Sequence, residues 1–346
     1  MVNSIKDLQK LIVSGFTDWK TLGDVSVRGN GDLLLFNYTP QAQFANRWNA
    51  LELISRGLII HKLTGEIVAR PFDKFFNWGE NNRTSEADIL TVTEKMDGSL
   101  GILYRQDGEH KIATRGSFDS EQAQWATEFL NKHYNLRDLA GDITLLFEII
   151  YPENRIVIDY GNEQALYLLA MRNRETGKYL PFWQVETAGA WYGFPVAKIY
   201  DFSDPDDILG VLSNLNANQE GYVVEFSDGQ RFKFKGDRYK ELHRLISDIS
   251  FKNTLAAVQT GTTDAIRSAI PDEFTKEFDR WVQEINTTIV NIKARVKEAM
   301  VNAPLNDRKT FALWVRDNHP DLSSFLFASL DGRDITPIIF KQAFRD

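Results

Sequence analysis

The sequence predicts an α+β fold, in which a region of antiparallel sheets is followed by an all-helical region. Two observations indicate this. From about residue 25 to 245, short β-branched and aromatic runs are separated by turns rich in Gly, Asn and Asp. After about Tyr239, apolar residues recur every three or four positions, which is the helical spacing. We therefore expect two domains, residues 1–245 and 246–346.

Within the first region, three hairpins are marked by the turn sequences LTGE, QDGE and ETGK, each between two β runs. Helices are expected at SEQAQWATEFLNKHY and around PDDILGVLSNLN. In the second region, a long helix is expected to begin with Pro271 in its first turn, followed by apolar residues in helical register from Phe274 to Met300. Its basic residues Lys293, Arg295 and Lys297 fit a solvated face better than RNA contacts.

Composition narrows the function classes. There is no cysteine, which excludes disulfides and thiolate metal sites. No apolar run approaches the roughly 20 residues that span a bilayer, and the polar start of the chain does not resemble a signal peptide. A cytoplasmic protein without membrane contact is expected. The net charge of −8 argues against a broadly basic nucleic-acid coat but leaves room for a local basic groove.

The stretch KMDGSLG combines a lysine with an Asp-Gly pair between two β runs. A charged surface turn explains these residues, and Asp97–Gly98 is expected to reverse the chain between two strands. A nucleophilic Lys95 explains them too. Because a free lysine has a pKa of about 10.4, attack would require nearby cations or desolvation to release the free amine. KMDGSLG alone leaves both interpretations open.

Cations that could surround Lys95 occur in RFKFK. Strand alternation places Arg231, Lys233 and Lys235 on one face, with two phenylalanines on the other. A solvated strand face is the commoner meaning of such a pattern. Three like charges on one face nevertheless repel unless an anion lies opposite, and a polyphosphate would suit.

Carboxylates form a third group. Glu148 interrupts the apolar run DITLLFEII, Glu220 begins EGYVVEF, and Asp97 lies in the lysine motif. A buried carboxylate is costly unless it is paired or faces a metal or ligand, although an outward-facing edge-strand glutamate is a fair alternative. Hard oxygen ligands suit Mg²⁺. The five histidines are scattered and do not indicate a zinc site.

Upstream of Lys95, the segments SRGLII and ARPFDKFFNWGE add the cations Arg56, Arg70 and Lys74. Aromatic residues cluster around them, namely Phe72, Phe75, Phe76 and Trp78. Most of these rings are expected in the core, and one could serve as a stacking platform for a base.

The order KMDGS, FEIIYPENRIV, EGYVVEF and KFK resembles the covalent nucleotidyltransferase superfamily of polynucleotide ligases and RNA capping enzymes. SRGLII, RPFDKFFN and the wording of FEIIYPENRIV point within it to the bacteriophage T4 RNA ligase 1 family. The resemblance covers residues from about 50 to 240 and implies a nucleotidyltransferase (adenylation) domain. The helical region has the position of that family's C-terminal domain, which helps to select RNA, in the known case a broken tRNA anticodon loop.

The resemblance implies an ATP-dependent RNA ligase. Lys95 would attack the α-phosphate of ATP and become lysyl-AMP, AMP would pass to an RNA 5′-phosphate, and a 3′-hydroxyl would then seal the strand. Such a protein would act on RNA ends, with nicked tRNA as one candidate substrate, and we expect a monomer.

The resemblance also assigns roles to the remaining motif residues. Asp97, Glu148 and Glu220 match positions that hold the waters of Mg²⁺, with Mn²⁺ as a substitute ion, and Glu148 also lies at the nucleotide. Lys233 and Lys235 match the pair at the α-phosphate. Further matches are Arg56 and Lys74 for the ATP phosphates, Phe76 or its neighbour Phe75 for adenine, and Arg115 for the sugar or RNA. An exposed hairpin arginine is the alternative reading of Arg115.

Three rival functions are weighed against this one. A DNA ligase or capping enzyme shares the motifs, but both usually continue into an OB-fold, whereas this sequence turns helical after Lys235. A non-catalytic RNA-end-binding module on the same fold is the rival from another class. Its motifs would be expected to have lost the lysine or a carboxylate, and here all are retained.

Overall fold

The computed structural model describes residues 2–39, 41–42, 48–216, 218–240, 242, 250–264, 266 and 272–344, with side chains of the last range from residue 278 onward. The chain forms two compact units, Met1–Lys240 and Glu241–Asp346. The first contains all the strands of the described residues, and the second is helical there. The α+β class predicted from the sequence is confirmed. Pro271 and the side chain of Phe274 lie outside the described residues.

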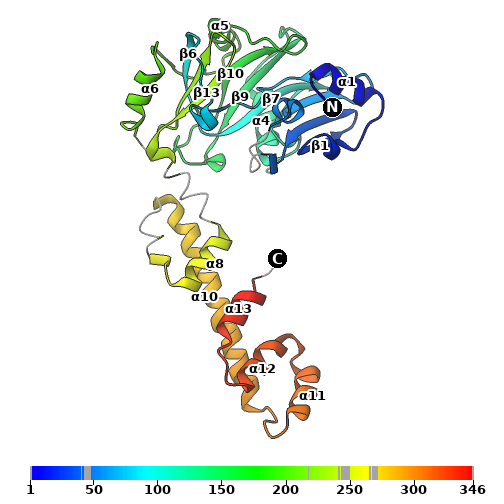
Figure 1. Ribbon diagram of the computed structural model, residues 1–346, viewed down its shortest axis with the longest axis vertical. Coiled ribbons are helices and arrows are strands. Elements are labelled where there is room, and N and C mark those ends of the chain that lie inside the picture. The colour runs from blue at the N-terminus through cyan, green and yellow to red at the C-terminus, as the bar shows by residue number, and fades with distance from the viewer. Residues whose placement is uncertain are drawn as a thin grey trace. The chain divides into compact units, whose positions relative to one another are not determined.

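Three sheets build the first unit (Figure 1). Sheet I has the order β1 (Val25–Asn30), β2 (Leu33–Tyr38), β3 (Arg56–His61), β4 (Ile67–Ala69). Sheet II has the order β10 (Ala165–Asn173), β9 (Ile143–Ile150), β7 (Ser99–Gln106), β8 (Glu109–Thr114). Sheet III has the order β11 (Ile199–Tyr200), β6 (Ile89–Glu94), β12 (Gly221–Phe226), β13 (Arg231–Lys235), β5 (Phe76–Asn77). All pairings are antiparallel except the parallel pair β13–β5.

The predicted turns are confirmed at all three positions. LTGE joins β3 to β4, and QDGE joins β7 to β8 with Asp107 and Gly108 both at positive φ, as a two-residue hairpin turn requires. ETGK follows β10, where Arg172 bridges to Tyr179. The predicted helices are α4 (Glu121–His133), capped by the Ser120 side chain, and α6 (Pro205–Leu212), capped by Asp204.

Helices cover one face of sheet II. The alternating residues Leu145, Phe147 and Ile149 of β9 pack with α4 and with α5 (Phe182–Tyr192). On the other face, Leu146 packs against sheet I. Glu148 lies on this second face, further along β9, so its carboxylate points away from the helices. Two short helices, α1 (Ile5–Val13) and α3 (Ala50–Ile54), pack with sheet I.

Sheet III has one apolar face and one charged face along β13. Phe232 and Phe234 of β13 join β12 and α6 in a core, whereas the lysines of β13 lie on the opposite face and are half-buried. The remaining short elements are 3₁₀ turns at Trp19–Thr21, Glu80–Asn82, Pro152–Asn154 and Pro320–Leu322.

The segment KMDG runs between sheets, contrary to the expected chain reversal between two strands. The strand before it, β6, belongs to sheet III, and the strand after it, β7, belongs to sheet II. The two strands do not pair with each other, and Gly98 does not have the positive φ of a tight hairpin turn. Lys95 and Asp97 therefore lie where the chain crosses from one sheet to the other, which brings both sheets to the same site.

The second unit is built around the long helix α10 (Asp272–Val301). Helices α8 (Phe251–Thr260), α12 (Ser323–Leu330) and α13 (Thr336–Gln342) pack against it, as Figure 1 shows, and α11 (Arg308–Asn318) packs against α12. Its core includes Val296, Phe311 and Leu326. Among the basic residues of α10, Arg295 pairs with Asp321 at 2.5 Å. Among the described residues, no helix is long and apolar enough to cross a membrane.

A buried arginine fixes the segment that precedes β5. Arg172 is 3% exposed and donates to both carboxylate oxygens of Asp73, at 3.0 and 2.7 Å, and to the carbonyls of Pro71 and Gly177. Because Asp73 directly precedes Lys74, this fork sets the course of the backbone that carries Lys74 and Phe76.

We expect Asp73→Ala to lower the stability of the protein, because it leaves the Arg172 guanidinium buried without its carboxylate. The cost should be about 2 kcal/mol, less than for a fully buried pair, because the Asp73 side chain is 42% exposed. Chemical denaturation followed by tryptophan fluorescence would measure it. Asp32→Ala is the matched control, since its partner Lys62 is itself 42% exposed and such pairs contribute little. Equal destabilisation by both changes would contradict the prediction.

Candidate active site

The lysine of KMDG is held by a buried glutamate. The backbone N–H of Lys95 donates to the Gly221 carbonyl at 2.9 Å, which extends the pairing of β6 with β12 by one residue. The Lys95 Nζ lies 2.6 Å from Glu220 Oε2, and the Glu220 side chain is 1% exposed. Burial alone would lower the pKa of Lys95, but Glu220, Glu148 and Asp97 outweigh it and raise that pKa. In this arrangement carboxylates are therefore the charges that shift the pKa of Lys95, and its role as nucleophile stays a prediction.

Glu220 binds a second lysine as well. Its other oxygen, Oε1, lies 2.8 Å from Lys235 Nζ at the end of β13. The following residue, Gly221, has a φ of 137°, and a Cβ there would lie 1.9 Å from the Phe234 carbonyl oxygen. Only glycine allows β12 to begin this close to β13. The close approach brings Glu220 within reach of both lysines.

Glu148 contacts the same turn from sheet II. Its Oε1 accepts the Gly98 N–H at 2.9 Å. A Cβ on Gly98 would lie 2.6 Å from the Ile149 carbonyl oxygen, so the turn needs glycine to approach β9. Burial raises the pKa of Glu148 to about 7, with Lys95 opposing the shift and Glu220 adding to it.

Asp97 is bound by protein donors. Its Oδ2 accepts the backbone N–H groups of Val157 and Ile158 at 2.8 Å each, and its Oδ1 accepts the Tyr239 hydroxyl at 2.7 Å. Its own N–H donates to the Tyr160 hydroxyl at 2.9 Å. In this arrangement Asp97 anchors the lysine turn to the loop after β9 and to the end of the first unit. Its role at a metal stays a prediction.

The three cations of RFKFK differ in their partners. Arg231 pairs with Glu225 at 2.7 Å and stacks on the Tyr179 ring, with its Cζ 3.6 Å from the ring centre. Lys235 pairs with Glu220, whereas Lys233 forms no ion pair with a described residue. Burial, reinforced by Arg56, Lys95 and Lys74, lowers the pKa of Lys233 well below its usual value. Arg231 and Lys235 are thus each paired with a protein carboxylate. Among the described residues Lys233 has no such partner, so it is free to bind an anion.

The upstream cations gather next to Lys233. Lys74 Nζ lies among three rings, 4.9 Å from the centre of Phe76, 5.1 Å from Trp48 and 5.9 Å from Tyr38. Burial lowers the pKa of Lys74 to about 8; Glu80 opposes the shift, and the nearby arginines add to it. The prediction that Phe76 stacks on adenine stays a prediction.

Arg56 and Arg115 lie on adjoining segments. Arg115 donates to the Tyr38 hydroxyl at 2.9 Å, and Arg56 lies 5.5 Å from the centre of the Phe75 ring. Between them, Gly57 has a φ of 94°, and a Cβ there would lie 3.1 Å from the Arg115 Cα. Burial lowers the pKa of Arg56, and Arg115 contributes in the same direction. The structure thus brings together all ten predicted site residues, which lie on strands of the three sheets and on the segments between them.

A cavity of about 540 Å³ opens beside these cations. Its lining includes Trp48, Lys74, Lys233, Lys235 and Lys240. Four lysines and one carboxylate, Glu80, line it, so its lining carries a net positive charge, and its volume is that of a small-molecule site.

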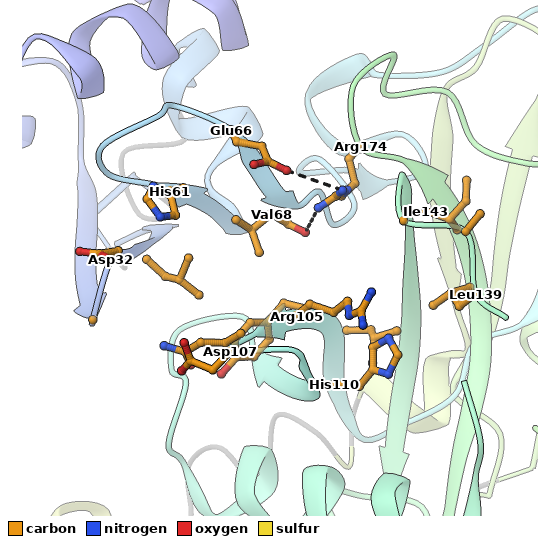
Figure 2. Close-up of a pocket in the computed structure, with 17 residues that line it drawn as sticks. Asp32, His61, Glu66, Val68, Arg105, Asp107, His110, Leu139, Ile143 and Arg174 are labelled. Atoms are coloured by element: carbon orange, nitrogen blue, oxygen red, sulfur yellow. Dashed lines mark hydrogen bonds and ion pairs between the residues drawn. The ribbon is translucent and has the colours of Figure 1, made fainter. Parts of the chain in front are cut away.

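A second cavity, of about 520 Å³, lies at the other end of β7 (Figure 2). Figure 2 shows Arg174 contacting Glu66 and the Val68 carbonyl on one wall, opposite Arg105 and His110 of the β7–β8 hairpin. None of the ten predicted site residues lines it. It is therefore separate from the candidate active site.

Comparison with known proteins is consistent with this geometry. A family model described as RNA ligase, of the T4 RNA ligase 1 type, matches residues 54–240. The chain belongs to this RNA ligase family. The match spans the strands and loops that carry all ten predicted site residues.

Individual proteins that are similar to this chain are also named RNA ligases. The chain is 31% identical to RNA ligase 1 of bacteriophage TS2126 over 56% of its own length and 52% of that protein. It is 24% identical to the RNA ligase of Rhodothermus phage RM378 over 89% of its length and 87% of that protein. Matches to three of the curated relatives span only 34%, 52% and 52% of those proteins. Among solved structures, an archaeal ATP-dependent RNA ligase shares the fold, with a TM-score of 0.52 and 16% identity over 90% of this chain and 88% of that one.

Several residues at this RNA-ligase-family site were not singled out by the sequence. Tyr239 and Tyr160 bind Asp97, and Tyr38 and Trp48 surround Lys74. Arg83 lies over the Phe76 ring at 4.0 Å. The two asparagines of GENNRT, both at positive φ, were the one local sign of a special backbone there. The tyrosines carry no local signal, because their partners are distant in sequence.

We expect Gly98→Ala to impair attack by Lys95, because the added Cβ would clash with the Ile149 carbonyl and displace the turn from Glu148. Because the sequence predicts Lys95 as the nucleophile, the rate at which α-labelled ATP labels the protein should fall at least about tenfold, corresponding to roughly 1.4 kcal/mol in the barrier. Gly141→Ala is the control, because a Cβ there meets nothing within 4 Å and its φ is not positive. Equal rates for the two variants would contradict this account of Gly98.

The pKa of about 8 for Lys74 predicts a pH-dependent affinity for phosphate anions. Because the lysine loses its charge as pH rises from 7 to 9, the affinity for inorganic pyrophosphate should fall by up to about tenfold more in the wild type than in Lys74→Arg, whose guanidinium stays charged. Calorimetric titration at pH 7, 8 and 9 measures this. Parallel profiles for the two proteins would show that Lys74 does not titrate in this range.

Proposed function

We propose that this protein is an ATP-dependent RNA ligase that joins RNA 3′-hydroxyl and 5′-phosphate ends through lysyl-AMP and adenylated RNA. One observation carries the proposal. Lys95 of KMDG lies between two sheets, contacting Glu220 and close to Glu148, with Lys235 on the same carboxylate and Lys233 nearby. A lysine, two carboxylates and two further cations therefore meet at one point, inside the segment that matches the family.

In the first step, the Lys95 Nζ would attack the α-phosphorus of ATP, forming the N–P bond as the bond to pyrophosphate breaks. Lys95 must lose a proton before attack, and Glu220 is the group in contact to accept it. Lys233 and Lys235 would bind the α-phosphate oxygens and offset the charge that develops there. Arg56, Lys74 and Arg115 would hold the remaining phosphates and the sugar or RNA.

The donor set fits a divalent metal ion that keeps most of its waters. Glu148 and Glu220 both raise the pKa of Lys95, so both carboxylates lie near its amine. Mg²⁺ is commonly held by one or two carboxylates together with substrate phosphates. In the described part of the chain, no group of three or more His, Asp or Glu side chains is arranged to hold a metal by itself. We propose that Asp97, Glu148 and Glu220 hold the waters of the ion, which is Mg²⁺ with Mn²⁺ as a substitute. When bound, it would supply positive charge at the reacting phosphate.

The second and third steps would use the same pocket. AMP would pass from Lys95 to an RNA 5′-phosphate, and a 3′-hydroxyl would then displace AMP. RNA repair, with nicked tRNA as substrate, is our proposal for the biological role, and the helical unit is proposed to select the RNA. Ligation of nicked tRNAs, linear RNAs and matched DNA ends would separate this function from that of a DNA ligase.

The decisive experiment is self-adenylation. The protein incubated with α-labelled ATP and Mg²⁺ should retain label on a denaturing gel, and Lys95→Ala should abolish it, because the nucleophile is removed. The same variant should still seal pre-adenylated RNA to some extent, because that step does not require lysyl-AMP. Lys62→Ala, which removes an exposed lysine paired with Asp32, is the control and should label normally. A wild-type protein that never retains label would be an RNA-end-binding module instead.

A further inference from the structure

The ring of Phe76 already has cations against it. Arg83 Cζ lies 4.0 Å from its centre and Lys74 Nζ lies 4.9 Å from it. Trp48 packs edge-on against the same ring, with centres 5.7 Å apart and planes at 75°. Two cations within 5 Å gain from the ring's electron density, and each is oriented by it. A ring surrounded in this way is suited to holding cations in place.

The backbone between Phe76 and Arg83 is built to return Arg83 to that ring. Gly79, Asn81 and Asn82 all have positive φ, of 75°, 53° and 59°. Such conformations are uncommon for residues other than glycine, and asparagine tolerates them best. The loop is closed by the Gly79 N–H, which donates to the Arg83 carbonyl at 2.9 Å, and by Glu80, which accepts from the Asn77 backbone and side chain.

Three buried hydrogen-bond donors near the Phe76 ring lack acceptors among the described residues. Arg83 Nη1, Arg56 Nη1 and Trp48 Nε1 are buried and have no hydrogen-bond partner among the described residues. Burial lowers the pKa of Lys74, and Arg83 adds to that shift. Neither forms an ion pair within the described part of the chain. Buried donors and repelling cations are costly unless an anion joins them, and phosphoryl oxygens accept from arginine especially well.

We propose that Arg83 is a further phosphate-binding residue, and that Phe76 is a positioning residue that holds Arg83 and Lys74 for a phosphate group in place of stacking on adenine. The proposal deepens the proposed ligase function and rests on it for the source of the phosphate. That source is either the polyphosphate of ATP or the 5′-phosphate of RNA, both of which present the same phosphoryl oxygens.

Binding measurements on the full-length protein test the role of Arg83. Three probes distinguish the sources: inorganic pyrophosphate, AMP, and a 5′-phosphorylated oligoribonucleotide compared with its 5′-hydroxyl form. Arg83→Ala should weaken pyrophosphate binding at least about tenfold and AMP binding less than threefold, and Arg83→Lys should recover part of the loss. Arg105→Ala is the control, because Arg105 is exposed, lies outside the candidate active site and donates to the nearby Gly108 carbonyl. If Arg83→Ala instead weakens only the 5′-phosphorylated strand, the phosphate belongs to RNA.

Phe76→Leu tests the positioning role. It should weaken pyrophosphate binding at least as much as Arg83→Ala while sparing AMP, because the ring holds both Arg83 and Lys74. The fold loss in the double variant should be smaller than the product of the two single losses, because part of the effect of the ring passes through Arg83. Loss of AMP binding with pyrophosphate binding retained would establish an adenine platform and overturn the proposal. So would an Arg83→Ala protein that binds every probe like Arg105→Ala. Thermal midpoints close to that of the wild type would exclude misfolding as the cause.

These outcomes are separable from the proposed function. A wild-type protein that forms no lysyl-AMP but binds pyrophosphate through Arg83 would refute the ligase function and leave the phosphate site standing. The opposite result is also possible to distinguish. If Arg83→Ala and Phe76→Leu both form lysyl-AMP with an unchanged KM for ATP and bind the phosphorylated strand normally, the phosphate site is refuted and the ligase function stands.

Discussion

The buried carboxylate of Glu220 is the interaction on which the site depends. It contacts Lys95 directly after β6 and Lys235 at the end of β13, each through a different oxygen. At 1% exposure, the carboxylate would be unstable without both partners, and the lysines would repel each other without it. The close approach of β12 to β13, which Gly221 alone permits, places the carboxylate there. The backbone conformation at Gly221 therefore makes the two ion pairs of Glu220 possible, and these ion pairs in turn stabilise the buried carboxylate.

Charge is divided between two adjoining zones. Around Lys95 the carboxylates dominate, so that the pKa of the lysine is raised. Around Lys233 and Lys74, burial lowers both pKa values, and neighbouring cations add to the shift. A polyanion would find its positive partners already in place in the second zone, and its arrival would change the field at Lys95. Preorganised charge of this kind is the usual source of large rate effects in phosphoryl chemistry.

The turn at Asp97 shows how the site is stiffened. Two backbone N–H groups and the Tyr239 hydroxyl bind the carboxylate, while Tyr160 accepts from its N–H. Because Tyr239 lies next to the end of the first unit, the chain leaves the first unit immediately after a residue that contacts the lysine turn. Asp97 thus has a defined structural role whatever it does at a metal.

The sequence by itself determined the features that are local. Strand alternation placed Lys233 and Lys235 opposite Phe232 and Phe234, turn residues located three hairpins, and the order of motifs identified the family. Tertiary structure alone decided which charges meet. It placed Glu220 against Lys95, gave Arg231 to Glu225, and carried KMDG from one sheet to another where a reversal had been expected. It also folded Arg83 over Phe76. The reason is physical: side-chain direction follows from the backbone period, whereas the partner of a buried charge is set by packing between segments far apart in sequence.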